Sequence, residues 1–288
     1  MTDIKLACAA WGFREMSLPE YFEAVKEMGI DYVEVNLGPN SPGHLAFDAS
    51  DGDLDRALQA AEDAGVQIVA LAGGNNFAAD DLDAEIAKVN RQIEMCEALG
   101  AEVLRIFAGW VGAADYTDAT FERVSDGLEQ VGKHAGAHGV MVAMENHGGI
   151  TATGAQCSRL LTDALKADDT LIDFTFNPAV SAMMGPPTVG LNYDPANFRH
   201  AGEDPLSALM VTADLINYSH WKDVRYVDGE PEYCAVGEGV IDWAPIVEDL
   251  LASGFDGYWA IEYEETEDIL RGTRDSAEYI RETLAAMG

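Results

Sequence analysis

The sequence predicts a (β/α)8 barrel, and three observations lead to this fold class. Eight short apolar runs alternate with longer segments that carry apolar residues at three- and four-residue spacing. A length of 288 residues is close to that of one such barrel, which commonly runs to ~250 residues. No GxGxxG fingerprint follows the first run, so an open doubly wound sheet is the lesser alternative. We therefore expect a single domain over residues 1–288.

Each apolar run is bounded by glycine, asparagine, proline or aspartate, which turn the chain. The predicted strands are residues 4–10, 32–37, 67–72, 102–107, 140–145, 189–194, 216–222 and 257–262. The helical patterns between them, for example over 18–29, 53–65, 84–100 and 121–139, end on glycine. The fifth unit is longer than its neighbours. We expect residues 165–188 to form an insertion over the barrel mouth, between strands five and six; an ordinary fifth helix with a long connection is the alternative.

The formal net charge of −34 comes from 51 acidic and 17 basic side chains that are spread along the whole chain. This distribution predicts a solvated acidic surface like that of halophilic, salt-adapted cytoplasmic proteins. The same charge opposes binding to nucleic acid and to anionic membranes, which depends on clustered lysine and arginine. No stretch approaches ~20 apolar residues and no basic leader precedes an apolar run, so we expect a cytoplasmic protein.

The four cysteines, Cys8, Cys96, Cys157 and Cys234, are widely separated along the chain. None forms a CxxC pair or has the spacing of a zinc knuckle. We expect reduced, mostly buried thiols.

The last four predicted strands each end in a potential metal ligand. Their sequences close on Glu145 (VMVAME), Asp194 (VGLNYD), His220 (INYSH) and Glu262 (YWAIE). In a barrel of this kind the active site gathers where the strands end. Three carboxylates brought together would repel one another and raise their pKa values, and a bound divalent ion is the simplest way to keep them ionised. A charge at one strand end commonly marks only where the strand leaves the core, so the prediction rests on the four together.

This ligand set suits manganese, our first choice, and also magnesium, cobalt, iron or zinc. Three oxygens and one nitrogen leave coordination positions open for substrate oxygens, as in a catalytic site.

Five motifs follow in order: MENHGG (144–149), NYDPAN (192–197), SHWKD (219–223), GEGVIDW (237–243) and AIEYE (260–264). With them the chain resembles the xylose-isomerase-like barrel family of sugar and sugar-phosphate isomerases and epimerases, within the superfamily that includes an abasic-site endonuclease. The resemblance implies that Glu145 and Glu262 bind the metal and exchange a proton with the substrate. It implies that Asp194 and His220 are ligands only, with a neutral His220 ring held by a further partner. It also implies a homo-oligomer, either a dimer or a tetramer.

Candidate substrate contacts are less specific. Several epimerases of the family have a histidine three residues after the aspartate, where this chain has Asn197. Asn197 can bond a substrate hydroxyl but cannot act as an acid, and a turn role after Pro195 is the alternative. The other candidates are His147, Lys222, Arg225, Trp11 and Trp110.

Each of these has a structural alternative. Lys222 and Arg225 supply positive charge near the metal, or pair with Asp223 or the acidic surface. His147 contacts substrate or forms a loop hydrogen bond. The two tryptophans stack on a sugar or cover core residues. Glu34 and Arg105, on strands two and four, are expected to form a buried salt bridge with each other.

The main functional prediction is a metal-dependent isomerase or epimerase that acts on a small ketose or related polyol through a cis-enediolate. The alternative is a lyase or dehydratase on a keto-sugar, keto-inositol or dehydroshikimate-like acid, because the same groups can expel a β-hydroxyl. An abasic-site endonuclease is a weaker alternative, since the net charge opposes DNA binding and Asn197 replaces a ligand histidine. A non-catalytic sugar-binding role would require an inert metal site. The scarcity of lysine and arginine favours an uncharged sugar.

Overall fold

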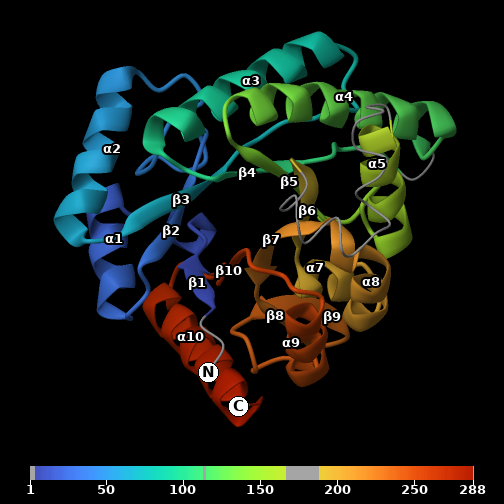
Figure 1. Ribbon diagram of the computed structural model, residues 1–288. Coiled ribbons are helices and arrows are strands. Elements are labelled where there is room, and N and C mark those ends of the chain that lie inside the picture. Colours follow the sequence, from blue (N-terminus) through green and yellow to red (C-terminus); the bar gives the residue numbers. More distant parts are fainter. Residues whose placement is uncertain (1–3, 113–114, 167–187, 288) are drawn as a thin grey trace.

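The computed structural model describes residues 4–112, 115–166 and 188–287. Eight parallel strands close into a barrel in the order β1-β10-β7-β6-β5-β4-β3-β2 (Figure 1). The predicted (β/α)8 fold is confirmed. The barrel strands are β1 Lys5–Cys8, β2 Tyr32–Asn36, β3 Gln67–Ala72, β4 Val103–Phe107, β5 Met141–Glu145, β6 Val189–Tyr193, β7 Ile216–Trp221 and β10 Tyr258–Ile261. Each lies inside the range predicted for it.

Helices surround the barrel on its outer side (Figure 1). Their bounds are α1 Leu18–Glu27, α2 Asp51–Ala64, α3 Leu82–Leu99, α4 Asp118–Ala137, α5 Gly154–Lys166, α7 Pro195–His200, α8 Pro205–Thr212, α9 Trp243–Ala252 and α10 Ile269–Met287, with short 3-10 helices η1 Trp11–Phe13 and η3 Ala213–Leu215. Two of the predicted helix-terminal glycines, Gly65 and Gly100, have φ of 70° and 68° and cap α2 and α3. Glycine, which has no Cβ, adopts this left-handed conformation without strain. The insertion predicted for residues 165–188 falls almost entirely on 167–187, which lie outside the described residues.

A two-stranded antiparallel hairpin follows β7 and was not predicted. It consists of β8 Asp223–Val227 and β9 Glu230–Cys234. Its turn residues Asp228 and Gly229 have φ of 53° and 90°, as the tight turns of two-residue hairpins require. An Asp-Gly pair is typical of such a turn. The pattern of eight alternating strands and helices, however, predicts only a connection for this segment.

The core lies between the strands and the surrounding helices, and a smaller apolar group fills the barrel interior. All four cysteines are free and buried, as predicted. Among the helices in the described part of the chain, none is long and apolar enough to cross a membrane.

Candidate metal centre

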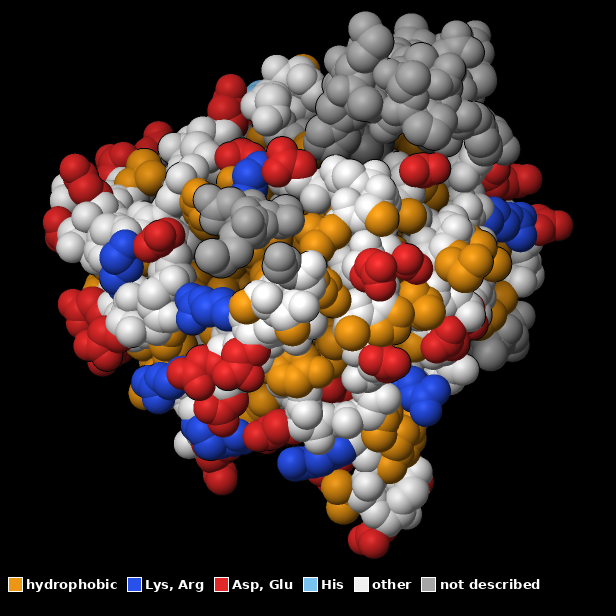
Figure 2. All heavy atoms as spheres, turned by 60° about the horizontal axis from the view of Figure 1, so that its bottom comes forward, with side chains coloured by type: hydrophobic (Ala, Val, Ile, Leu, Met, Phe, Trp, Pro, Cys, Tyr) orange, Lys and Arg blue, Asp and Glu red, His pale blue; other side chains and the backbone are white. Residues whose placement is uncertain are grey.

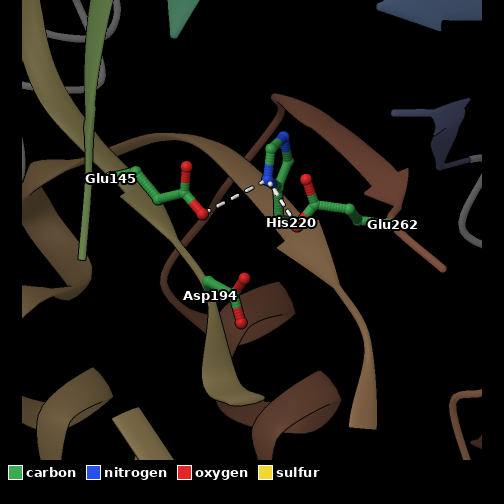
Figure 3. A group of neighbouring side chains, drawn as sticks. All are labelled: Glu145, Asp194, His220 and Glu262. Carbon is green, nitrogen blue, oxygen red and sulfur yellow. Dashed lines mark ion pairs between the residues drawn. The ribbon is translucent and has the colours of Figure 1, made fainter. Parts of the chain in front are cut away.

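The four predicted ligands lie together at the carboxyl ends of four neighbouring strands. Glu145 is the last residue of β5, His220 lies in β7, and Asp194 and Glu262 directly follow β6 and β10. Their side chains point toward one another (Figure 3). One ligand atom from each residue lies within 4.8 Å of the others, and all four side chains are buried. The arrangement can hold one metal ion.

The imidazole of His220 is oriented for metal binding. Its Nε2 lies 3.0 Å from Glu34 Oε2, so the buried carboxylate holds the proton on that nitrogen. Its Nδ1 is buried without a hydrogen-bond partner among the described residues and faces Glu262 Oε2 at 3.3 Å and Glu145 Oε1 at 3.7 Å. A metal ion bound to Nδ1 would take the place of a proton between these two carboxylates, and the residues present therefore fit a divalent ion.

The charges around His220 also fit a divalent ion. Four buried carboxylates, Glu34, Glu145, Asp194 and Glu262, face two buried cations, Arg105 and Lys222. These groups alone leave an excess of negative charge, to which the partly buried Glu264 beside Lys222 adds. Such an excess is costly in a buried site, and a divalent cation would reduce it.

The two cations hold different carboxylates. Arg105 Nε lies 3.3 Å from Glu145 Oε2. Lys222 Nζ lies 2.8 Å from both Asp194 Oδ2 and Glu264 Oε1 and also contacts Glu262. The predicted salt bridge between Glu34 and Arg105 is therefore corrected: Glu34 pairs with His220 and Arg105 with Glu145. The order of strands around the barrel explains this outcome: β4 and β5 are neighbours, so Arg105 meets Glu145, whereas Glu34 on β2 reaches across the barrel interior to His220 on β7.

The pKa values of the cluster follow from these contacts. Burial raises the pKa of Glu145, but the neighbouring Arg105 and His220 outweigh burial and lower it to about 2. Burial together with the charges of Glu145 and Glu262 raises the pKa of Asp194 to about 6, although Lys222 opposes this. Burial lowers the pKa of His220, but Glu262 and Glu34 raise it well above its ordinary value overall. The cluster thus favours a positive charge at its centre, which a proton or a metal ion can supply.

Local backbone structure positions Asp194. The side chain of Asn146 donates to the Asp194 carbonyl and accepts from the Asp194 N–H, both at 2.8 Å. This amide continues the pairing of β5 with β6 beyond the last strand residue. Asp194 is also the N-cap of α7, where its Oδ1 accepts from the backbone N–H of Asn197 at 2.9 Å.

The motifs SHWKD and GEGVIDW meet at Asp223. Its buried carboxylate accepts hydrogen bonds from Trp243 Nε1 at 2.8 Å and from the backbone N–H groups of Val224, Gly237 and Ile241. Gly239 lies so close that a Cβ there would meet Asp223 Oδ1 at 2.1 Å. Asp223 therefore organises the loop after the hairpin, and the two motifs are joined structurally.

The predicted substrate contacts fall in different places. His147 and Trp110 form an aromatic group with Phe107 at the ends of β4 and β5, with ring centroids 4.9 to 5.4 Å apart, and Trp110 is 53% exposed. Lys222 and Asn197 are buried against the four ligands. Trp11 lies on η1, and the Arg14 guanidinium carbon lies over it, 4.6 Å from the centroid of the Trp11 ring. Arg225 lies on the exposed hairpin, where it pairs with Glu232 at 3.5 Å and not with the cluster.

Sequence reasoning missed three residues that shape the site: Glu34 as the partner of His220, Asn146 as the support of Asp194, and Tyr233 of β9. The Tyr233 hydroxyl donates to Asn197 Oδ1 at 2.6 Å. Glu34 and Asn146 were visible as polar residues in or beside apolar strands, but their partners were not.

Comparison with curated proteins finds inosose dehydratases from several bacteria. The protein from Lacticaseibacillus casei is 29% identical over 159 residues, which are 50% of this chain and 47% of that protein. The protein from Geobacillus thermodenitrificans is 27% identical over 176 residues, which are 55% of this chain and 53% of that protein. The match thus spans about half the length of each curated relative.

Solved structures share the fold across nearly the whole chain. An L-ribulose 3-epimerase has a TM-score of 0.77 and 17% identity, covering 99% of this chain and 95% of that one. A probable 3-DHS dehydratase from Bacillus anthracis has a TM-score of 0.73 and 16% identity, with coverage of 96% and 99%. The IOLI protein, solved with a zinc atom, has a TM-score of 0.73 and 19% identity, with coverage of 98% and 97%.

A family model decides the classification, because it matches residues 22–283. Its description agrees with the closed barrel and with the enzymes that share the fold. The chain belongs to the xylose isomerase-like TIM barrel family.

Proposed function

We propose that this enzyme is a divalent-metal-dependent dehydratase of a small keto-sugar or keto-inositol. The observation that carries the proposal is the placement of Glu145 and Glu262 on either side of His220, at 3.7 and 3.3 Å from Nδ1. Two carboxylates on opposite sides of one point can remove and deliver protons on a substrate held between them. The inosose dehydratases among the curated relatives support the choice of a cyclic ketone as substrate.

The ligands for the ion would be Glu145, Asp194, His220 and Glu262. A bound divalent cation would polarise the substrate carbonyl and so acidify the neighbouring C–H. One glutamate takes that proton and the substrate becomes an enediolate. That proton then passes by way of the other glutamate to the β-hydroxyl, which leaves as water while the carbon–carbon double bond forms, and both glutamates end ionised as they began. Lys222, in contact with Glu262 and Glu264, stabilises the ionised form of Glu262, which a carboxylate that accepts a proton requires.

Epimerisation or isomerisation is the second candidate, because it shares the first proton transfer. The second glutamate would then return a proton to carbon instead of to the leaving oxygen. The symmetrical placement of the two carboxylates about His220 supports this reading. The exposed ring of Trp110, beside His147, offers an apolar face for a sugar in either reaction.

Proton NMR in D2O separates the two reactions. The protein is loaded with Mn²⁺, kept at high salt and incubated with a panel of inososes, ketoses and dehydroshikimate. The Mn²⁺ is removed before the spectra of the products are recorded. A sample treated with chelator before the incubation is the control. Metal-dependent loss of a hydroxyl with formation of an enone supports the dehydratase. Deuterium uptake at carbon without loss of water supports the epimerase or isomerase instead. No exchange with any substrate would contradict both, and abasic DNA would be tested next.

The two glutamates are tested by isosteric replacement. Glu145→Gln and Glu262→Gln should each lower kcat by about 10²–10⁴-fold, because an amide cannot take up the proton. Both should also weaken Mn²⁺ binding in calorimetry. Glu102→Gln is the matched control, since Glu102 bonds the Tyr258 hydroxyl away from the cluster and should leave turnover unchanged. Full activity in either active-site variant would contradict the mechanism.

A further inference from the structure

Asn197 contacts two of the four proposed metal ligands at once. It is 3% exposed and lies in the first turn of α7. Its backbone N–H donates to Asp194 Oδ1 at 2.9 Å, and its side-chain Nδ2 donates to Glu145 Oε1 at 2.9 Å. Arg105 holds the other oxygen of Glu145 at 3.3 Å. Both oxygens of this carboxylate are therefore supported by protein groups, one of which is the Asn197 amide.

The β8–β9 hairpin holds the other end of the same amide. The hydroxyl of Tyr233 on β9 donates to Asn197 Oδ1 at 2.6 Å, and the Tyr233 ring lies 4.8 Å from Lys222 Nζ. An ionised carboxylate only accepts hydrogen bonds, so the amide must present its NH2 group to Glu145 and its oxygen to Tyr233. A flipped amide would place its oxygen against the Glu145 carboxylate and lose that bond. Tyr233 thus stabilises the one amide orientation that supports Glu145.

We propose that Asn197 is a positioning residue for Glu145, and that Tyr233 acts through it, so that the hairpin supports the metal centre. This inference deepens the proposed function and rests on it. It assigns Asn197 a role different from the substrate contact expected from the sequence, because its oxygen and one of its N–H groups are already bonded within the protein. Without the amide, Glu145 Oε1 would keep only the more distant His220 Nδ1, and its side chain could rotate away from the ligand position.

A double-mutant cycle on metal affinity tests the proposal without any substrate. Mn²⁺ is titrated calorimetrically into the full-length metal-free protein and into Asn197→Leu, Tyr233→Phe and the double variant. Outer partners of metal ligands commonly contribute about 10–100-fold to affinity. We expect about a 10-fold loss for Asn197→Leu and about a 3-fold loss for Tyr233→Phe. The double variant should bind no more weakly than Asn197→Leu, because Tyr233 has no amide left to orient.

The controls separate this effect from loss of structure. Tyr226→Phe removes a hydroxyl from the same hairpin at a residue that is 46% exposed, and it should leave affinity within about twofold. Tyr233→Phe is nearly isosteric and should fold normally, so the coupling can be measured even if Asn197→Leu is destabilised. Circular dichroism melting curves check this for each variant.

Kinetics with the substrate found in the D2O assay provide the second readout. A positioning role predicts that kcat falls while KM stays within about threefold, whereas a lost substrate contact would raise KM. Additive losses in the double variant, or unchanged Mn²⁺ affinity in Asn197→Leu, would overturn the inference and leave the proposed function standing. A wild-type chain that binds no Mn²⁺ would instead contradict the metal centre, and the inference with it.

Discussion

At the scale of single residues, the partner of His220 decides which ring nitrogen faces the cluster. Glu34 bonds Nε2 at 3.0 Å and both side chains are fully buried. A buried carboxylate behind a histidine ligand fixes the ring and increases the electron density on the opposite nitrogen. Glu34 therefore belongs to the candidate site, although it directs no atom that the proposed ion would contact.

Replacing Glu34 should weaken metal binding. Glu34→Ala removes the acceptor and should lower Mn²⁺ affinity by about 10–100-fold in a calorimetric titration. Glu34→Gln keeps an oxygen that can accept from Nε2, so its loss should be clearly smaller. Equal affinity in Glu34→Ala and wild type would show that the ring needs no support from this side.

His44 is a partly buried histidine that makes stability depend on pH. Its Nδ1 accepts from the Asn36 N–H at 3.4 Å and its Nε2 bonds the Phe13 carbonyl at 3.2 Å. Burial lowers its pKa from 6.5 to about 4, although the Phe13 carbonyl acts in the opposite direction. Between these two values the unfolded chain binds a proton that the folded chain does not, so acid favours unfolding.

The stabilisation should be complete above pH 6.5 and lost as the pH falls toward 4. With a slope of about 1.4 kcal/mol per pH unit, the loss over this window is about 3 kcal/mol. The measurement compares urea unfolding of wild type and His44→Gln across this range, because the other titrating groups are common to both proteins. The difference in unfolding free energy between the two should shrink as pH falls. A constant difference would contradict a neutral His44 in the folded state.

At the scale of elements, asparagine side chains extend two of the barrel's strand pairs. Asn146 pairs with both backbone groups of Asp194 at 2.8 Å, between β5 and β6. Asn75 makes the same two bonds to Phe107, at 2.7 and 2.9 Å, between β3 and β4. At both points the barrel strands diverge toward the loops, and the amide supplies the ladder bonds that a neighbouring backbone no longer provides.

These two residues form a matched pair for mutation. Asn146→Ala and Asn75→Ala should each lower the unfolding free energy by about 2–4 kcal/mol, since each leaves a buried N–H and C=O without partners. Only Asn146→Ala should also weaken Mn²⁺ binding, because only Asn146 holds a proposed ligand. Urea melts and calorimetry of both variants measure the two effects. Equal losses of affinity would mean that the support is general to the barrel mouth and not specific to Asp194.

At the scale of the whole molecule, the net charge of −34 is carried by a surface on which acidic side chains are dispersed. Figure 2 shows them scattered over the visible face among hydrophobic and basic groups, without a single large patch. Several lysines and arginines are taken up in exposed ion pairs, such as those of Arg271 with three carboxylates. Most of the repulsion between the remaining acids acts through solvent, where salt screens it.

We therefore predict that salt stabilises the fold. Raising NaCl from 50 mM to 1 M shortens the screening length from more than ~10 Å to ~3 Å. The melting temperature should rise by about 5 °C or more, which for a chain of this size corresponds to roughly 1–3 kcal/mol. Scanning calorimetry of the metal-free protein avoids any effect of salt on metal binding. The same melting temperature at both salt concentrations would rule out the salt-adapted surface.

The sequence alone determined the barrel and the four candidate ligands. Both depend on order along the chain: apolar runs of fixed length alternate with helical periodicity, and Glu145, Asp194, His220 and Glu262 each stand at a strand's carboxyl end. Parallel strands of a closed barrel bring those ends to one rim, so position along the strand was sufficient.

Pairings across the barrel could be decided only by the tertiary structure. Glu34 was assigned to Arg105 because both are charged residues on nearby strands, yet it bonds His220 from β7. Tyr233 reaches Asn197 because an unpredicted hairpin folds back over the strand ends. Such contacts depend on strand stagger, side-chain length and the path of a connection, and none of these has a periodic signature in the sequence. The order of residues along the chain therefore decides which side chains lie at the carboxyl ends of the strands. The closed barrel decides which of these side chains contact one another.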